Sequence, residues 1–219
     1  MAWAAGLHTR GKPYPARAQN ITTFTNGRFT PGHGDLAEVE QGLEASEPDG
    51  LPTVLPLRKV RKALPDVPTV LLITDEDCLI EDFEFAALDL RGAATVSCSN
   101  LRSPRPVSEA VYAFETGALA DAALRSHLDI THLKAGEPSI LADWAAKAGA
   151  MQIVTPFVTY GPLRDWLNLA EPHLMARGIT LCENRRPWDE AIWPYATAGF
   201  FKVKKQIPRI LDQMIKMDP

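Results

Sequence analysis

The sequence lacks the marks of a membrane-spanning, secreted or disulfide-stabilised protein. It has no run of about eighteen apolar residues, which excludes a transmembrane helix, and no apolar stretch of signal-peptide length near Met1. Its three cysteines, Cys78, Cys98 and Cys182, are far apart and lack the CxxC spacing of a zinc site. We therefore expect a cytoplasmic protein with no membrane partner, whose cysteines are reduced and buried.

Familiar phosphate-binding and hydrolytic motifs are also missing. Neither GxGxxG nor GxxxxGK[ST] occurs, so a dinucleotide or nucleoside-triphosphate clamp of the usual kind is not expected. No two histidines have the HExxH arrangement, and no GxSxG elbow is present. The residues themselves thus predict neither a metal site nor a catalytic group.

What is present is the composition of a folded chain. Of its 219 residues, 46% are hydrophobic and 23% are charged, close to the averages of globular proteins. The net charge of −4 is unevenly spread, because residues 1–30 are basic and the stretch that follows Asp35 is acidic. Frequent proline and glycine from Pro31 to Pro68 break any long period, which predicts a linker over residues 31–67.

After Pro68, short runs rich in Val, Ile and Leu alternate with amphipathic stretches of helical length. The strand candidates are 69–74, 94–99, 129–133, 151–156 and 179–183. Strands this apolar, separated by helices, predict a doubly wound, five-stranded parallel sheet of Rossmann-like type over residues 68–219. In the first crossover helix, an apolar stripe for packing is expected from Val111, Phe114, Ala118, Ala122 and Leu124.

Acidic residues gather just past the first strand, at Asp75, Glu76, Asp77, Glu81 and Asp82. The carboxyl edge of an open α/β sheet is where ligands bind, so a magnesium or ribose-hydroxyl role is conceivable. Helix capping and the helix dipole explain acids at a helix start equally well, and we favour that interpretation. Cys182 precedes Arg185 and Arg186, which could lower its thiol pKa, but a buried structural cysteine is the preferred interpretation.

Two segments combine aromatic and basic side chains. In residues 185–211, tryptophan, tyrosine and phenylalanine alternate with arginine and lysine, which suits single-stranded nucleic acid or, as we favour, anchoring over the sheet or against another domain. In residues 1–30, Trp3 could stack on a base while Arg10, Lys12 and Arg17 contact phosphate.

Residues 3–21, WAAGLHTRGKPYPARAQNI, resemble the stretch near the end of the FAD-binding domain in the photolyase/cryptochrome family. There, a tryptophan is followed by a small-small-Gly element, Pro-Tyr, an arginine and an asparagine, matched here by Trp3, Pro13-Tyr14, Arg17 and Asn20. The likeness extends through TTFTNGRF, and the residues after Pro68 resemble the antenna-type α/β domain of that family. It implies that residues 1–30 are the C-terminal remnant of a helical FAD-binding domain.

The resemblance implies a parent flavoprotein that uses FAD for light-driven repair of pyrimidine dimers, a lyase reaction, or for blue-light sensing. Its partner would be damaged or single-stranded DNA. Trp3 would stack on a flipped-out base. The remaining residues expected to face DNA are Arg10, Lys12, Tyr14, Arg17 and Asn20.

Most of the FAD site of that family has no counterpart in this chain, because its phosphate-binding Thr/Ser loop and its arginine and aspartate contacts are missing. The chain also opens on a core-like apolar run, as a piece cut within a domain would. We therefore expect a fragment that does not hold FAD alone and is inactive alone, with an unidentified antenna chromophore. Two alternatives stay open. One is an α/β module that holds a nucleotide or a pterin- or deazaflavin-like chromophore near Asp75–Asp77 and Gly136. The other is a structural partner of a separate helical flavin domain, docked through residues 185–211.

Overall fold

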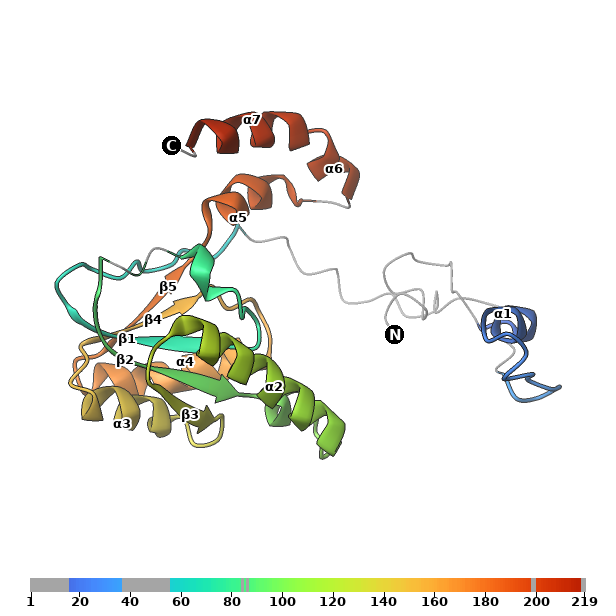
Figure 1. Cartoon of the computed structure of the whole chain (residues 1–219), viewed down its shortest axis with the longest axis horizontal. Coiled ribbons are helices and arrows are strands. Elements are labelled where there is room, and N and C mark those ends of the chain that lie inside the picture. Colours follow the sequence, from blue (N-terminus) through green and yellow to red (C-terminus); the bar gives the residue numbers. More distant parts are fainter. Residues whose placement is uncertain (1–15, 37–55, 84, 86, 198–199, 218–219) are drawn as a thin grey trace. The chain divides into compact units, whose positions relative to one another are not determined.

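The computed structural model describes residues 16–36, 56–83, 85, 87–197 and 200–217. The chain divides into two compact units, Met1–Leu55 and Pro56–Pro219. In the described part of the first unit, helix α1 (Ala18–Phe24) is followed by a turn in which Asn26 and Gly27 have φ of 51° and 73° (Figure 1). Left-handed backbone suits Asn-Gly, which explains the turn at this dipeptide.

The second unit is built on one five-stranded, all-parallel sheet with the order β3-β2-β1-β4-β5 (Figure 1). Its strands are β1 (Pro68–Thr74), β2 (Asp89–Ser97), β3 (Ile130–Lys134), β4 (Gln152–Pro156) and β5 (Thr180–Asn184). The predicted doubly wound α/β fold is confirmed. The unit begins at Pro56, earlier than the boundary expected at residue 68.

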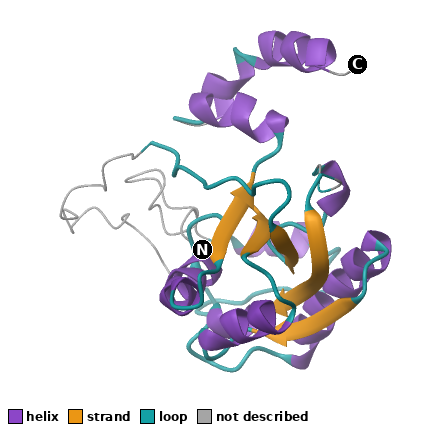
Figure 2. Ribbon diagram, turned by 90° about the vertical axis from the view of Figure 1, so that its left-hand side faces the viewer, coloured by secondary structure: helices purple, strands orange, loops and turns teal. Residues whose placement is uncertain are grey.

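Helices cover both faces of this sheet (Figures 1 and 2). Helices α3 (Ser139–Lys147) and α4 (Pro162–Met175) bury Leu141 and Leu167 in the same apolar cluster as Val70 and Ile153. The opposite face is covered by α2 (Glu109–Ser126) and by the short 3-10 helix η1 (Ile80–Asp82). The connection from β1 to β2 therefore contains no α-helix among the described residues.

Helix α2 differs from its predicted packing. Its buried residues are Glu115, Leu119 and Ala122, whereas Phe114 is 80% exposed and Leu124 is 77% exposed. The predicted stripe is therefore wrong at Val111, Phe114 and Leu124, because apolar and small residues occur all around this helix and the periodicity did not single out the face on the sheet. Ala122 is buried as predicted, and Ala118 is half-buried.

The segment before β1 belongs to the sheet unit. The backbone N–H of Glu183 donates to the carbonyl of Arg61 at 2.9 Å, and the side-chain amide of Gln152 is bonded to both backbone groups of Leu64. Arg58 reaches the Glu183 carboxylate at 2.5 and 2.9 Å. Residues 58–64 are thus bonded to strands β4 and β5 and are part of the sheet unit.

After β5 the chain forms short helices. These are α5 (Pro187–Ile192), the 3-10 helix η3 (Trp193–Tyr195), α6 (Phe200–Lys204) and α7 (Ile207–Met217). A further 3-10 helix, η2 (Ser99–Leu101), follows β2. Among the described residues, no helix is both long enough and apolar enough to cross a bilayer.

Candidate functional site

The strand order places a topological switch between β1 and β4, the position at the carboxyl edge where open α/β sheets usually bind ligands. The loops that follow these strands meet there, since the Thr159 hydroxyl lies 3.4 Å from the Glu76 carboxylate. The hydroxyls of Thr74 and Thr155 are buried inside the sheet beneath this edge. The first candidate site is therefore the carboxyl edge near Asp75–Asp77.

Arginine side chains form ion pairs with the acidic residues of this edge. Arg102 donates to the carboxylates of Asp75 at 2.9 Å and Glu76 at 3.0 Å. Arg186, just beyond β5, binds Asp77 through two hydrogen bonds of 2.5 and 2.8 Å. The bonds to Asp77 raise the pKa of Arg186, so its charge is permanent. Because Asp75, Glu76 and Asp77 are each bonded to an arginine of the fold, they favour a structural edge over an open cation or ribose site.

The helix start expected at these acids is a 3-10 helix, η1, with Glu81 and Asp82 in its first turn and no side-chain cap hydrogen bond. The element that follows β1 is the 3-10 helix η1, and the Asp77 carboxylate accepts a hydrogen bond from the backbone N–H of Leu79 at 3.1 Å within the loop. Asp82 is bonded to Arg186 at 2.9 Å, and Glu81 is paired with Arg125. The acids therefore connect this loop, through ion pairs, to Arg186 after β5 and to Arg125 on α2, and they do not cap an α-helix.

Cys98, Asp75 and Glu115 form a group whose potential metal ligands lie within 4.8 Å of one another. The Glu115 carboxylate is already occupied, because it accepts hydrogen bonds from the backbone N–H of Cys98 at 2.6 Å and from Ser99 at 2.6 and 2.9 Å. The Cys98 thiol donates to Asp75 at 3.1 Å, and burial raises its pKa to about 12. A neutral thiol beside the Arg102 guanidinium favours a structural cluster over a metal site.

The remaining cysteines are also free thiols. Cys182 is buried and burial raises its pKa, which agrees with a structural role and not with a thiolate activated by the arginines behind it. Cys78 is only half-buried, so the expectation that all three cysteines are buried is wrong at this position. Its pKa is likewise raised by burial.

Gly136, the other residue named for a ligand at this edge, follows β3. Its carbonyl oxygen accepts a hydrogen bond from the Trp166 indole at 2.7 Å. That bond ties the loop to α4. The Gly136 carbonyl therefore has a structural role in this loop.

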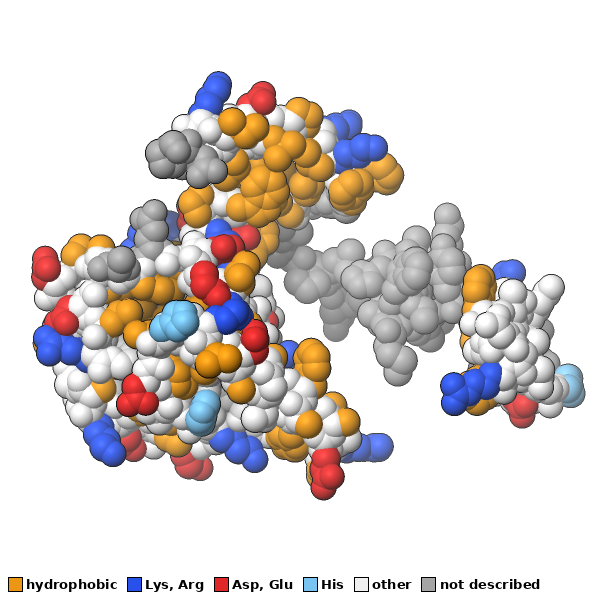
Figure 3. Space-filling model, viewed as in Figure 1, with side chains coloured by type: hydrophobic (Ala, Val, Ile, Leu, Met, Phe, Trp, Pro, Cys, Tyr) orange, Lys and Arg blue, Asp and Glu red, His pale blue; other side chains and the backbone are white. Residues whose placement is uncertain are grey.

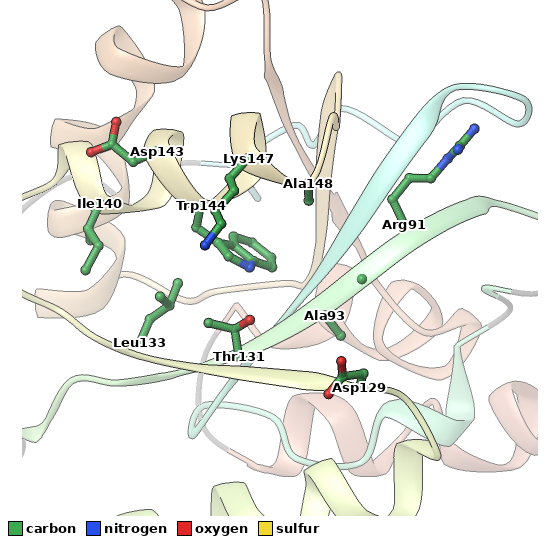
Figure 4. Close-up of a pocket in the computed structure, with 11 residues that line it drawn as sticks. Arg91, Ala93, Asp129, Thr131, Leu133, Ile140, Asp143, Trp144, Lys147 and Ala148 are labelled. Carbon is green, nitrogen blue, oxygen red and sulfur yellow. The ribbon is translucent and has the colours of Figure 1, made fainter.

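A different hollow lies on the face of the sheet beside α3 and near the amino ends of β2 and β3 (Figure 4). Its volume is about 510 Å³, within the range of small-molecule sites. The floor is strand backbone and side chain from Gly92 to Ala93 and from Thr131 to Leu133, and the wall is the side of α3. We call this hollow the Trp144 groove.

The side chains of the Trp144 groove are suited to a flat ligand. Figure 4 shows the Trp144 indole over the strands, the Lys147 ammonium beside it, and the Asp129 carboxylate and Thr131 hydroxyl turned toward the hollow. At Gly92 a Cβ atom would meet nothing within 4 Å, so the floor is open there. A glycine inside a strand is a common mark of close approach by another group.

A comparison with models of known protein families finds no match for this chain, and a comparison with curated proteins finds none either. The resemblance of residues 3–21 to the photolyase/cryptochrome family therefore stays a prediction.

The residues expected to face DNA are only partly described. Trp3, Arg10, Lys12 and Tyr14 lie outside the described residues. Arg17 is the N-cap of α1, and Asn20 lies within it, and both side chains are exposed. The structure thus brings two of the six expected residues onto one short helix.

The basic and aromatic residues of 185–211 divide into two groups. Trp193 packs edge-on against Phe157 at the end of β4, with ring centroids 5.0 Å apart, and Arg209 lies 5.8 Å from the Tyr195 ring centroid. The Trp193–Phe157 contact agrees with anchoring over the sheet, and the Arg209–Tyr195 contact joins α7 to η3. Phe200 and Phe201 instead remain 64% and 73% exposed.

The Trp144 groove was not found from the sequence. The sequence predicts a crossover helix between the strand candidates 129–133 and 151–156, and a tryptophan in such a helix is typical of the core. Two local signals could have indicated it: one tryptophan among the alanines of α3, and a glycine inside β2.

Proposed function

We propose that the α/β unit binds a planar heteroaromatic ligand, of nucleotide, pterin or flavin type, in the Trp144 groove. The observation that carries the proposal is the half-buried Trp144 indole facing an open hollow of about 510 Å³ (Figure 4). Stacking of a base on an aromatic side chain contributes about 1–3 kcal/mol. This moves the ligand expected at Asp75–Asp77 to the opposite end of the strands.

The polar groups around Trp144 favour a ring that carries both donors and acceptors. The Asp129 carboxylate can accept from a ring N–H, the Thr131 hydroxyl can do either, and the Lys147 ammonium can donate to a ring carbonyl or pair with a phosphate. An all-carbon ring would leave these groups without partners. Pterins, flavins and nucleobases meet the requirement, and the chain's own role is to bind and orient such a ring.

The wider proposal is that this unit is the accessory domain of a photolyase/cryptochrome-like flavoprotein, whose parent carries out light-driven repair of DNA or blue-light sensing. Its support is the resemblance of residues 3–21 and the α/β fold that follows them. In this proposal, DNA is a partner of the parent, and exposed Arg17 and Asn20 contribute to that contact.

The described residues do not fit FAD itself. Dinucleotide pyrophosphates sit at a helix N-terminus after the first strand of such sheets. Here β1 is followed by a 3-10 helix, and Arg186 spans the loop to Asp77. We therefore place FAD, and the photochemistry that it supplies, in a separate helical domain. Chromatography of the ligand released from the purified chain tests this part: stoichiometric FAD would contradict it, whereas a smaller flavin would agree with the Trp144 groove.

The ligand proposal is tested by fluorescence titration of the chain with riboflavin and, separately, with AMP. Trp144→Leu should weaken the binding of whichever probe binds by about tenfold or more, because the stacking surface is lost. The matched control is Trp188→Leu, which removes an indole that is 42% exposed on α5. Equal affinity in the Trp144→Leu variant and the wild type would reject the groove as the site.

A further inference from the structure

Helices α6 and α7 carry a charge opposite to that of the chain. Between Phe200 and Met217 there is a single acid, Asp212, so the segment has a net charge of +4 although the whole chain has −4. Its cations are Lys202, Lys204, Lys205, Arg209 and Lys216. The described side chains among these are exposed. This segment is therefore a local cationic surface on an acidic protein.

The same two helices expose apolar side chains. In α7 the apolar residues recur at intervals of three and four and share one side of the helix, and Figure 3 shows such side chains gathered over α6 and α7. Ile210 is buried and α7 packs on α5, but Leu211 is 43% exposed and Ile215 is 72% exposed. Phe200 and Phe201 add two exposed rings.

We propose that α6 and α7 form an interfacial element that lies on an anionic lipid surface. A helix with an apolar side, a cationic polar side and flanking phenylalanines inserts its apolar side chains at the boundary between headgroups and acyl chains. Lysine and arginine reach the headgroups while their stems stay in the apolar layer. The absence of a long apolar run excludes spanning the membrane and does not bear on lying upon it.

The shape of the exposed surface favours lipid over the other anionic partner, single-stranded nucleic acid. Nucleic acid would use the rings of Phe200 and Phe201 for stacking, but it offers nothing to the aliphatic Leu211 and Ile215. Lipid acyl chains accept all four. A symmetric contact between two copies through α6 and α7 would bring two cationic segments together, which is unfavourable.

The test is co-sedimentation of the full chain with vesicles of phosphatidylglycerol and phosphatidylcholine, and with vesicles of phosphatidylcholine alone. We expect binding to the anionic vesicles, about tenfold or more weaker binding to the neutral ones, and a decrease as salt is raised. The double variant Phe200→Ser/Phe201→Ser and the double variant Lys204→Glu/Lys205→Glu should each lower the partition coefficient by about tenfold or more.

Two controls match these variants on other surfaces. Phe114→Ser removes a phenylalanine that is 80% exposed on α2, and Lys59→Glu reverses an exposed charge. Neither should change vesicle binding, and circular dichroism should show the same helix content in every variant. Failure of the wild type to bind anionic vesicles would overturn the proposal. So would tighter binding to a single-stranded oligonucleotide that the α6–α7 variants abolish, or a stable dimer that they dissociate.

Discussion

The two ends of the parallel sheet differ in how their charged groups are used. At the carboxyl edge, the carboxylates of Asp75, Glu76 and Asp77 are bonded to Arg102 or Arg186. In the Trp144 groove, Asp129 and Lys147 line an open hollow. Charges that have partners within the fold contribute to stability, and charges left open are available to a ligand. A sheet edge that is the usual ligand site of its fold class can thus be a structural edge in a particular chain.

The strongest test of this contrast is the buried carboxylate of Glu183, next to the carboxyl edge. It is 4% exposed and accepts hydrogen bonds from Arg58, from Arg164 and from the backbone N–H of Val158. Glu183→Gln should lower the free energy of unfolding by about 3 kcal/mol, because it leaves the buried Arg164 charge with only the half-exposed Glu171 as counter-ion. Urea denaturation measures this.

Glu190→Gln is the matched control for Glu183→Gln. Glu190 is an exposed acid paired with Arg185 at 3.1 Å, so its loss should cost less than about 0.5 kcal/mol. Riboflavin binding should be unchanged in both variants. A Glu183 variant as stable as the control would show that the carboxyl edge does not depend on its ion pairs.

A smaller loss of stability is expected when Arg186 is replaced. Arg186→Met removes the two bonds to Asp77 and the contact of the guanidinium with the Phe83 ring, 4.4 Å from its centroid. The free energy of unfolding should fall by about 1–2 kcal/mol, and Arg186→Lys should not restore it, since lysine lacks the planar fork. Arg105→Met, at an exposed position, is the control. Full rescue by lysine would contradict a bidentate role.

A substitution at Gly92 should change stability and ligand binding in opposite directions. Gly92→Val should raise the free energy of unfolding by up to about 1 kcal/mol, because a β-branched residue suits a strand and its Cβ meets nothing within 4 Å. The same side chain fills the floor of the Trp144 groove, so riboflavin affinity should fall by about tenfold. Gly117→Ala on α2 is the control that should stabilise without changing affinity. Unchanged riboflavin affinity in Gly92→Val would place the ligand elsewhere.

The alkaline pH dependence of stability is the smallest effect, since it vanishes at neutral pH. The folded pKa of Cys98 is about 12, above its ordinary value of 9.0, because burial disfavours the thiolate. A raised folded pKa means that the contribution of Cys98 is fully present below pH 9 and is lost as pH rises toward about 12. Cys98→Ala should therefore flatten the fall in stability over this window relative to the wild type. Identical slopes in the two proteins would contradict a buried, neutral thiol.

The fold and the site differed in how far the sequence predicted them. Strands β1 and β4 were found because a buried parallel strand is an apolar run, and they agree with their predicted ranges to within one residue. The ion pairs at the carboxyl edge could not be predicted from such a local pattern. The partners of Asp77 and Asp75 lie 109 and 27 residues away in the chain, at Arg186 and Arg102, and no local pattern links such positions.

The packing of helix α2 and the Trp144 groove were both missed from the sequence, for related reasons. Periodicity finds the packed face of a helix only when the other face is polar, and in α2 Phe114 and Leu124 lie outside that face. Trp144, in contrast, looks like a core residue in the sequence. It faces a hollow because Gly92, on the strand opposite, has no side chain to fill that space.

Hydrogen exchange of the chain with and without bound riboflavin tests the contrast most directly. The account predicts slower exchange in peptides that cover residues 129–134 and 140–148, which form the floor and wall of the Trp144 groove, and no change at residues 75–77 and 157–161. Protection confined to residues 75–77 and 157–161 would contradict it and would return the ligand to the carboxyl edge.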